Sequence, residues 1–368
     1  MMTNKIFSFV AILISFCAVN LHAADWTLYR GDAAASGRVN AEVKLADKLK
    51  ITWEERLEKG FFEATPIVVG DSIFIGSDDE GLKAHDLQTG KPKWTYKGEF
   101  SASAAYFDGL VFVGDSKGVL HAVDSETGNK KWMFATKGTI DNSPNIDVPT
   151  KRVIIGSQGG TLFALEAATG QLVWEYKTDD QIRCFPSIVG RHCFVAGCDS
   201  FLHVVDLDTG KGVSKIPLDS PTGSTPLLAG DVAFVGTEGN EFLAVDWKKE
   251  KVLWRFSMRQ AVRSPAAYRE GTVIFGGMDR TVYALDAKTG EERWKFTTKG
   301  RIEGGVVIVG DKVYVPSMDS SLHVLDFQSG KRIDSIELTG KLSASPAVVS
   351  DRLIIATDEG VLICLQGE

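Results

Sequence analysis

The sequence is poor in the residues and spacings from which many catalytic and metal sites are built. Five cysteines and six histidines are spread over 368 residues, and no C-x2-C pair is present to hold zinc. No H-E-x-x-H helix motif and no phosphate-binding glycine loop occurs. Basic residues are fewer than acidic ones, 41 against 48, so the chain has no electrostatic footprint for nucleic acid.

The cysteines beyond the N-terminus do not form a metal-binding pattern. Three of the four lie close together with the spacing C-x8-C-x4-C, and His192 is beside them. This spacing matches no zinc site, so the sequence favours buried thiols or one local disulfide. The disulfide state stays open for all four, Cys184, Cys193, Cys198 and Cys364.

Charge is almost absent from the first 24 residues. Lys5 is the only charged residue before Asp25, and an apolar run, "IFSFVAILISFCAV", follows it at 6–19. The small-residue exit "LHAA" then ends at Ala24. A secretory signal has this layout, and the run is short for a membrane helix.

We therefore expect a signal peptide at 1–23 that is cleaved after Ala23. The mature chain would be exported to the periplasm or to the cell surface, or secreted, and would have no transmembrane span. An uncleaved anchor is the alternative. A lipid on Cys17 is a further one, which is disfavoured because the bulky Phe16 stands where lipoprotein signals have a small residue.

Beyond this region the sequence repeats itself. "TLFALEAATGQLVWEY" at 161–176 returns nearly unchanged as "TVYALDAKTGEERWKF" at 281–296. The acidic residue before the turn recurs in steps of 38 and 42 and then four of 40, and a further step of 40 reaches Gln366. The seven acidic positions are Asp86, Asp124, Glu166, Asp206, Asp246, Asp286 and Asp326. The period predicts eight repeat units.

Each unit has the pattern of four short strands. In the first, two apolar runs at 65–70 and 72–77 are split by a tight turn at Gly70 and Asp71. A third run ends at Asp86, and a fourth, "KPKWTYK", carries Trp94. Four short strands in about 40 residues describe one blade of a β-propeller.

The eighth unit ends without a fourth strand. The segment "LKITWEERL" at 49–57 carries Trp53 at the right spacing to supply it. We therefore predict an all-β protein, an eight-bladed propeller of four-stranded blades at 49–368, whose last blade is closed by this N-terminal strand. The propeller forms one domain, monomeric, after an N-terminal segment at 24–48. Truncation of 25–40 is expected to be mild, and truncation of 25–57 severe.

A tryptophan recurs on the fourth strand of most blades. A large ring at the same place in successive blades can pack blade against blade, so these residues are expected to be structural. They are Trp53, Trp94, Trp132, Trp174, Trp254 and Trp294. Two blades have Ser214 and Asp334 there instead, and these sectors are expected to be softer.

The repeat resembles a known family at these residues. "ALDAKTGEERW" at 284–294 and "AVDSETGNKKW" at 122–132 are similar to the A-x-D-x-x-T-G-x-x-x-W hallmark of pyrroloquinoline-quinone-like (PQQ-like) propeller repeats. The segment "DWTLYRGDAAASG" at 25–37 resembles the W-x-x-x-R-G stretch that precedes the propeller in many exported members. The resemblance covers nearly the whole mature chain.

The resemblance implies one of two functional classes. One contains alcohol and sugar dehydrogenases that hold the quinone and calcium in the central funnel, and the other contains scaffolds of outer-membrane protein assembly. The dehydrogenases have adjacent cysteines over the quinone, but this sequence has no Cys-Cys pair, no C-x-x-C-H haem motif and no matching calcium ligands. We therefore expect a non-catalytic scaffold for other envelope proteins, without cofactor or metal. A PQQ- and calcium-dependent dehydrogenase and a saccharide-binding module are the alternatives.

One loop position can be followed around the funnel, just before the first strand of each blade. Its occupants are Glu63, Ser101, Asp141, Arg183, Gly223, Arg263, Glu303 and Ser343. The charged residues at this loop position, together with Asn142, form the candidate binding set: Glu63, Asp141, Asn142, Arg183, Arg263 and Glu303. Arg183 and Arg263 flank Gly223 and could hold a carboxylate, a phosphate or an acidic loop. The alternative is that the charges only pair with one another and with water.

Overall fold

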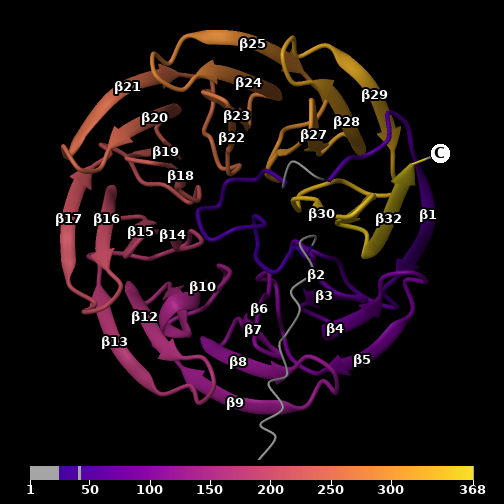
Figure 1. The fold of residues 1–368 in the computed structure, drawn as a ribbon, viewed down its shortest axis with the longest axis vertical. Coiled ribbons are helices and arrows are strands. Elements are labelled where there is room, and N and C mark those ends of the chain that lie inside the picture. The colour runs from indigo at the N-terminus through magenta and orange to yellow at the C-terminus, as the bar shows by residue number, and fades with distance from the viewer. Residues whose placement is uncertain (1–24, 40–42, 368) are drawn as a thin grey trace, which may run out of the picture.

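Eight four-stranded antiparallel sheets surround a central axis (Figure 1). The computed structural model describes residues 25–39 and 43–367, so the expected signal peptide at 1–23 and Cys17 lie outside the described residues. The sheets are the blades of the expected eight-bladed propeller, which confirms the predicted fold. No helix in the described ranges has the length and apolar character needed to cross a membrane.

The first four blades follow the chain without interruption, and each strand pairs with the next. Blade 1 contains β2 (Ile67–Val69), β3 (Ser72–Ser77), β4 (Gly81–Asp86) and β5 (Pro92–Tyr96). Blade 2 contains β6 (Ala105–Phe107), β7 (Leu110–Gly114), β8 (Val119–Asp124) and β9 (Lys130–Ala135). Blade 3 contains β10 (Asn145–Asp147), β11 (Arg152–Ser157), β12 (Thr161–Glu166) and β13 (Leu172–Lys177). Blade 4 contains β14 (Ser187–Val189), β15 (His192–Ala196), β16 (Phe201–Asp206) and β17 (Gly212–Pro217).

The last four blades continue the order until the ring closes. Blade 5 contains β18 (Leu227–Ala229), β19 (Val232–Gly236), β20 (Glu241–Asp246) and β21 (Lys251–Ser257). Blade 6 contains β22 (Ala267–Arg269), β23 (Thr272–Gly276), β24 (Thr281–Asp286) and β25 (Glu292–Thr297). Blade 7 contains β26 (Val307–Val309), β27 (Lys312–Ser317), β28 (Ser321–Asp326) and β29 (Arg332–Glu337). Blade 8 contains β30 (Ala347–Val349), β31 (Arg352–Ala356), β32 (Val361–Gly367) and β1 (Leu49–Arg56).

The two ends of the chain close the ring together. Strand β1 is antiparallel to β32, with Leu49 opposite Gly367 and Arg56 opposite Val361, as the sequence predicts. The innermost and second strands of most blades meet at a tight turn whose residues have positive φ, such as Gly70 (54°). In blade 3 a short 3-10 helix, Val148–Thr150, takes the place of that turn, which explains the one step of 42 residues.

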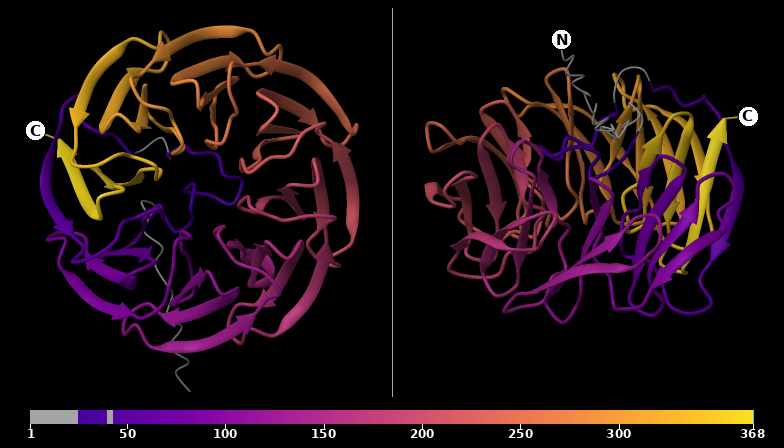
Figure 2. Two further views of the ribbon diagram at one scale, coloured as in Figure 1. Left: turned by 180° about the vertical axis from the view of Figure 1, so that it is seen from behind. Right: turned by 60° about the horizontal axis from the view of Figure 1, so that its bottom comes forward.

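The N-terminal segment 25–39 lies inside the ring rather than outside it (Figure 2). The middle residue of the innermost strand donates its N–H to a carbonyl of this segment in six blades. These bonds run from Val68 to Trp26 (2.9 Å), Tyr106 to Thr27 (2.9 Å), Ile188 to Ala33 (2.6 Å), Leu228 to Ala34 (3.2 Å), Tyr268 to Ser36 (3.1 Å) and Ile308 to Gly37 (2.9 Å). The segment therefore pairs with strand edges that would otherwise face the open channel.

This arrangement differs from the minor role expected of residues 25–40. Trp26 and Arg30 are fully or almost fully buried at the axis, at 2% and 0% exposed. One guanidinium nitrogen, Nη2 of Arg30, donates to the carbonyls of Ala266 (3.2 Å) and Val306 (2.6 Å) in two different blades. The segment is thus an axial plug that joins most of the ring, and we call residues 25–39 the plug below.

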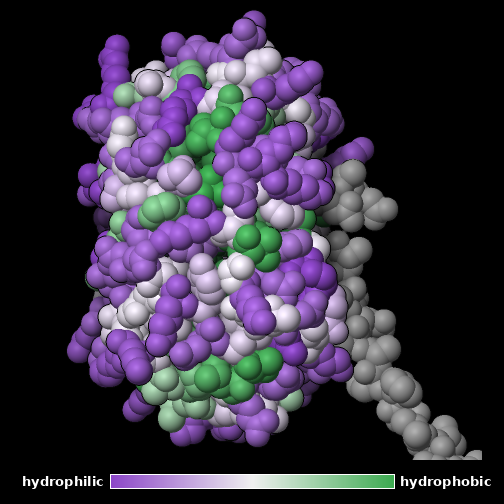
Figure 3. Space-filling view, turned by 90° about the vertical axis from the view of Figure 1, so that its left-hand side faces the viewer, coloured by the Kyte–Doolittle hydropathy of each residue, from purple (hydrophilic) through white to green (hydrophobic). Residues whose placement is uncertain are grey.

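The outer surface of the ring is formed by the fourth strands of the blades. Figure 3 shows one side of it, where apolar patches are scattered among polar side chains. On blades 3 to 5 the exposed residues include Val173, Val213 and Leu253. The equivalent residue on blade 2, Lys131, instead pairs with the turn carboxylate of Asp124 (2.9 Å). Isolated apolar residues of this kind are normal on a protein surface.

Candidate functional site

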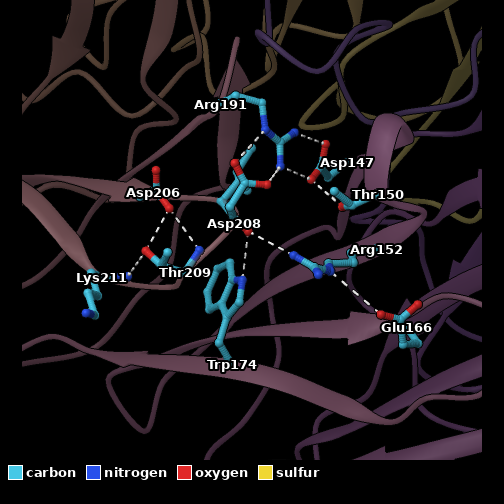
Figure 4. Close-up of polar contacts among 11 residues, drawn as sticks. Asp147, Thr150, Arg152, Glu166, Trp174, Arg191, Asp206, Asp208, Thr209 and Lys211 are labelled. Carbon is cyan, nitrogen blue, oxygen red and sulfur yellow. Dashed lines mark hydrogen bonds and ion pairs between the residues drawn. The ribbon is translucent and has the colours of Figure 1, made fainter.

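The six repeated tryptophans lie at the junctions between blades. Trp174 on β13 donates from Nε1 to the carbonyl of Leu207 in blade 4 at 2.9 Å (Figure 4). A Cβ added to Gly210 would lie 2.6 Å from the same indole, so the ring sits directly on this glycine. The other five make the same contacts one blade on, with acceptors Leu87 for Trp53, Ser125 for Trp94, Ala167 for Trp132, Ala287 for Trp254 and Phe327 for Trp294.

The junction without a tryptophan on blade 4 is filled from the other side. Ser214 stands at the tryptophan position, and the next turn has Glu250 (φ 53°) where other turns have glycine. Trp247 of blade 5 packs instead against Phe194 and His192 of blade 4, with ring centroids 5.2 and 4.9 Å apart. Trp247 thus covers part of this junction, while Oγ of Ser214 is buried without a partner among the described residues, and the softer sector expected at Ser214 stays a prediction.

An ion pair reinforces the junction between blades 3 and 4. Arg191 donates from Nη1 and Nη2 to both carboxylate oxygens of Asp147 at 2.8 and 3.0 Å, and also pairs with Asp208 (Figure 4). The Asp147 side chain is 1% exposed. The two carboxylates raise the pKa of Arg191. These contacts, like those of the tryptophans, stabilise the ring. Because the blade junctions have this structural role, we look for a binding site at the centre of the ring.

A cavity of about 280 Å³ lies at the mouth of the central channel. The loops that lead into the innermost strands of blades 1, 3, 4 and 6 place Glu63, Asp141, Arg183 and Arg263 around it. Asn142 also lines it, as do Ser101 and Gly223. The structure therefore brings five of the six candidate residues to one site, and Glu303 lies outside the lining.

Two aromatic rings, one from the plug and one from blade 4, form part of this cavity wall. Tyr29 and Phe185 both line the cavity, with ring centroids 5.8 Å apart. Burial raises the pKa of Tyr29, so its hydroxyl is neutral at physiological pH. The plug is thus a part of the site as well as a part of the fold.

The two arginines of the mouth have different partners. Arg263 donates from Nε and Nη2 to both carboxylate oxygens of Glu238 at 2.9 and 3.1 Å. Arg183 has no carboxylate partner among the described residues and donates from Nε to Gln181 Oε1 at 3.0 Å. Glu303 pairs with Arg301. The arginines therefore do not form the open clamp around Gly223 that the sequence suggested.

Sequence reasoning missed the residues that neutralise these charges. Glu238 and Gln158, which contacts Asp141, lie between the second and third strands of their blades. The loops between the second and third strands recur with the same period as the rest of the repeat, so the repeat itself marks these positions in the sequence.

Few positive charges and hydrogen-bond donors offset the negative charge of the acidic side chains at the mouth. Desolvation, then the charges of Asp78 and the more distant Glu303 and Asp141, raise the pKa of Glu63. Desolvation also raises the pKa of Asp141, while Gln158 and Arg183 lower it. Asp78, which the sequence did not suggest, has its pKa raised by desolvation and by neighbouring carboxylates. The mouth therefore contains negative charge that its own residues do not neutralise.

Asn142, which lines the same cavity, has a hydrogen-bond acceptor without a donor. Its side chain is 4% exposed, and its amide nitrogen Nδ2 donates to the carbonyls of Gly156 (3.2 Å) and Ile182 (3.0 Å). Because both amide hydrogens have carbonyl acceptors, the orientation of the amide is fixed. Its Oδ1 is buried and has no donor among the described residues.

The cysteines are free thiols in the described part of the chain. Cys184, Cys193 and Cys364 are buried, and Cys198 is partly exposed. Burial raises the pKa of the Cys184 thiol to about 12 and that of the Cys193 thiol as well. Buried thiols of this kind are weak nucleophiles, so this region has a packing role.

One hydrolase-like pattern in the sequence has no catalytic geometry. Residues 114–118 read G-D-S-K-G, which matches the G-x-S-x-G of a nucleophile elbow, but they follow strand β7 and lead into β8 rather than into a helix. Ser116 donates to Glu99 Oε2 at 2.8 Å. No histidine among the described residues accepts the proton of its hydroxyl, so the serine is not activated.

The donor set of the mouth does not fit a quinone with calcium. No group of three histidine, cysteine, aspartate or glutamate residues within the described ranges could hold a metal ion. The axis itself is filled by the plug, with Arg30 in contact with two blades.

Comparison with solved structures finds similar folds in BamB and in dehydrogenases. BamB from Moraxella catarrhalis superposes with a TM-score of 0.74 and 20% identity, over 87% of this chain and 100% of that one. Quinohemoprotein alcohol dehydrogenase from Comamonas testosteroni gives 0.79 and 16%, over 94% and 81%. A europium-containing methanol dehydrogenase gives 0.80 and 13%, over 94% and 98%. At these identities the similarity shows the fold alone.

Comparison of the sequence itself is more specific. No curated protein sequence matches the chain. A family model described as "Outer membrane protein assembly factor BamB" matches residues 29–144, 95–187, 117–214 and 198–368, which together cover most of the plug and all eight blades. The chain therefore belongs to the PQQ-like propeller family of the outer membrane protein assembly factor BamB.

Proposed function

We propose that this chain is a non-catalytic scaffold of the cell envelope that binds other exported proteins through the mouth of its channel. The proposal includes export, with the mature chain in the periplasm or at the cell surface. Membership of the BamB family supports it, and a role in outer-membrane protein assembly is its most specific form. Propellers commonly bind partners at one face or at the axis, where loops from every blade converge.

One observation carries the choice of scaffold over enzyme. The chain fills its own central channel with residues 25–39, whose carbonyls accept hydrogen bonds from six blades. In a quinoprotein dehydrogenase of this fold the funnel must hold a cofactor, a calcium ion and a substrate. Here the remaining cavity of about 280 Å³ is lined by mixed charges and by Tyr29 of the plug. A surface that receives a protein loop needs no larger space.

A reconstitution experiment separates the two classes. The purified mature protein is mixed with pyrroloquinoline quinone and calcium, and the absorbance of the quinone and the reduction of an artificial dye with alcohols and sugars are followed. We expect neither a bound-quinone spectrum nor dye reduction. Stoichiometric quinone binding with alcohol-dependent dye reduction would show a dehydrogenase and would overturn the scaffold proposal.

Site-specific photo-crosslinking tests the scaffold function directly. A photoreactive residue at Ser101, in the mouth, is compared with one at Val213, on the exposed outer strand of blade 4. In intact cells the mouth position should give discrete crosslinked protein bands that the outer position does not. Identical patterns from both positions would show that the mouth is not the binding surface.

A further inference from the structure

Several hydrogen-bond acceptors at the mouth lack a donor among the described residues. Among the described residues no hydrogen bond is donated to the carboxylate of Glu63. Asp78 lies outside the cavity lining, but its charge acts on Glu63, and its Oδ1 is buried without a partner. Asp141 receives one amide, from Gln158. The buried Oδ1 of Asn142 has none. Glu63 and Asp141 are exposed, whereas the two Oδ1 atoms are buried. A buried acceptor without a donor is costly, so this wall is suited to a ligand that donates.

The neighbouring cations cannot be that donor. Arg263 is held by both oxygens of Glu238, and Arg301 is paired with Glu303. Arg183 lowers the pKa of Asp141 through its charge but directs Nε to Gln181. Of the lining charges without an ion-pair partner among the described residues, Glu63 and Asp141 are negative and Arg183 is positive, so the net uncompensated charge of the mouth is negative.

The aromatic part of the wall adds a second preference for a cation. Tyr29 and Phe185 line the same cavity as Glu63 and Asp141. The face of an aromatic ring attracts ammonium and guanidinium groups, and it also packs against the methylene stem of a long basic side chain. Carboxylates and aromatic rings in one cavity are a combination that recognises such side chains.

We propose that the mouth binds a lysine or arginine side chain presented on a loop of a partner protein. The proposal rests on the scaffold function, and it adds the chemistry of the contact. A cavity of about 280 Å³ accommodates one long side chain, whose charged end lies among Glu63, Asp141 and Asn142 Oδ1. The opposite ligand, an acidic group held by Arg183 and Arg263, is disfavoured because Glu238 already occupies Arg263.

A peptide-binding experiment on the purified full mature protein tests the ligand chemistry. The probes are Ac-Gly-Ser-Lys-Ser-Gly-NH2, the same peptide with Nε-acetyl-lysine, and the same peptide with glutamate at that position, all measured by calorimetry at low salt. We expect the lysine peptide to bind at least about tenfold more tightly than either of the others, because only it supplies a charge-assisted donor. Tighter binding of the glutamate peptide would overturn the proposal.

Variants locate the binding in the mouth. Glu63→Gln combined with Asp141→Asn should weaken the lysine peptide by at least about tenfold, and Glu337→Gln, which removes one acid from the outer rim, should leave it unchanged. Arg183→Ala should bind the lysine peptide more tightly than the wild type, since it removes a repelling charge. An unchanged affinity in the double variant, or a loss in Arg183→Ala, would contradict the proposed site.

Two further comparisons separate this proposal from the scaffold function. If the photo-crosslinks from Ser101 persist in the Glu63→Gln, Asp141→Asn variant, the scaffold function stands and the basic side-chain site is wrong. Spermidine serves as a small-amine probe in the same calorimeter. If it binds more tightly than the lysine peptide and no protein crosslinks from Ser101, the occupant is a free amine, and the partner-protein proposal is overturned together with the scaffold.

Discussion

At the scale of single residues, the molecule contains charges with opposite effects on its stability. Arg191 and Asp147 are paired across a blade junction with an almost inaccessible carboxylate. Glu63, Asp78 and Asp141 stand at the mouth with raised pKa values and no full partner. The first arrangement stabilises the ring, and the second destabilises it at neutral pH. Residues kept at a cost to stability are typical of binding sites.

Removal of Arg191 should show how much the buried pair contributes. Arg191→Ala leaves Asp147 buried without its cation, and breaking such a pair costs about 3 kcal/mol, reduced here because Arg191 is one-third exposed. Lys248→Ala, which breaks a pair with Asp231 that is more than half exposed on both sides, should cost less than about 1 kcal/mol. Chemical denaturation of the two variants measures the difference. Equal costs would show that Asp147 is stabilised by other groups.

The charge of Glu63 should make stability depend on pH. Its folded pKa is raised above 4.5, so the folded protein binds this proton more tightly than the unfolded chain does. The contribution of this bound proton to the free energy of unfolding is fully present below pH 4.5 and is lost as the pH rises through the folded pKa. Glu63→Gln should therefore raise the melting temperature at pH 7, by no more than the equivalent of about 1 kcal/mol because the group is partly exposed. The gain should vanish near pH 4, and a gain that is the same at both pH values would contradict this assignment.

At the scale of elements, the repeat could be predicted because its physics is local. The turn glycine, the acidic residue before it and the tryptophan after it lie within one unit, so their spacing reveals strands and blade count. The sequence shows that Ser214 replaces the tryptophan of blade 4. It does not show that Trp247 fills the same junction, because that ring comes from a different position of the next unit. In that unit the turn position holds Glu250, since no indole covers it.

Alanine substitutions at two glycines with similar φ angles can distinguish the energetic contribution of the tryptophan contact from that of backbone strain. Gly210 (φ 69°) lies under Trp174, whereas an added Cβ at Gly190 (φ 59°) would meet nothing within 4 Å. Gly190→Ala should cost about 1 kcal/mol, the penalty of the left-handed conformation alone. Gly210→Ala should cost at least about 2 kcal/mol more, because the methyl group displaces the indole. Thermal unfolding of both variants measures this, and equal losses would mean that the indole moves freely.

At the scale of the whole molecule, the closing strand could be predicted and the plug could not. Strand β1 carries the same tryptophan and spacing as the other fourth strands, so the sequence identifies it. The plug binds mainly through its own carbonyl oxygens, which every residue type has, and no periodicity marks such a segment. The candidate site shows the same difference. The repeated loop position predicted six residues that line the cavity, whereas Tyr29 of the plug and Glu238 were not predicted.

The plug gives the last prediction, which reverses the mild effect expected from the sequence. Deletion of 25–40 removes eight backbone hydrogen bonds with six blades, each worth about 1 kcal/mol, and exposes the cavity left by Trp26, whose loss alone costs about 3 kcal/mol. The shortened protein should unfold at a much lower denaturant concentration and in a broader transition, because the plug couples blades that otherwise contact only their neighbours. It should also lose the lysine-peptide binding, since Tyr29 leaves with the plug. A shortened protein that unfolds like the wild type would show that the ring holds itself together through β1 and the tryptophans alone.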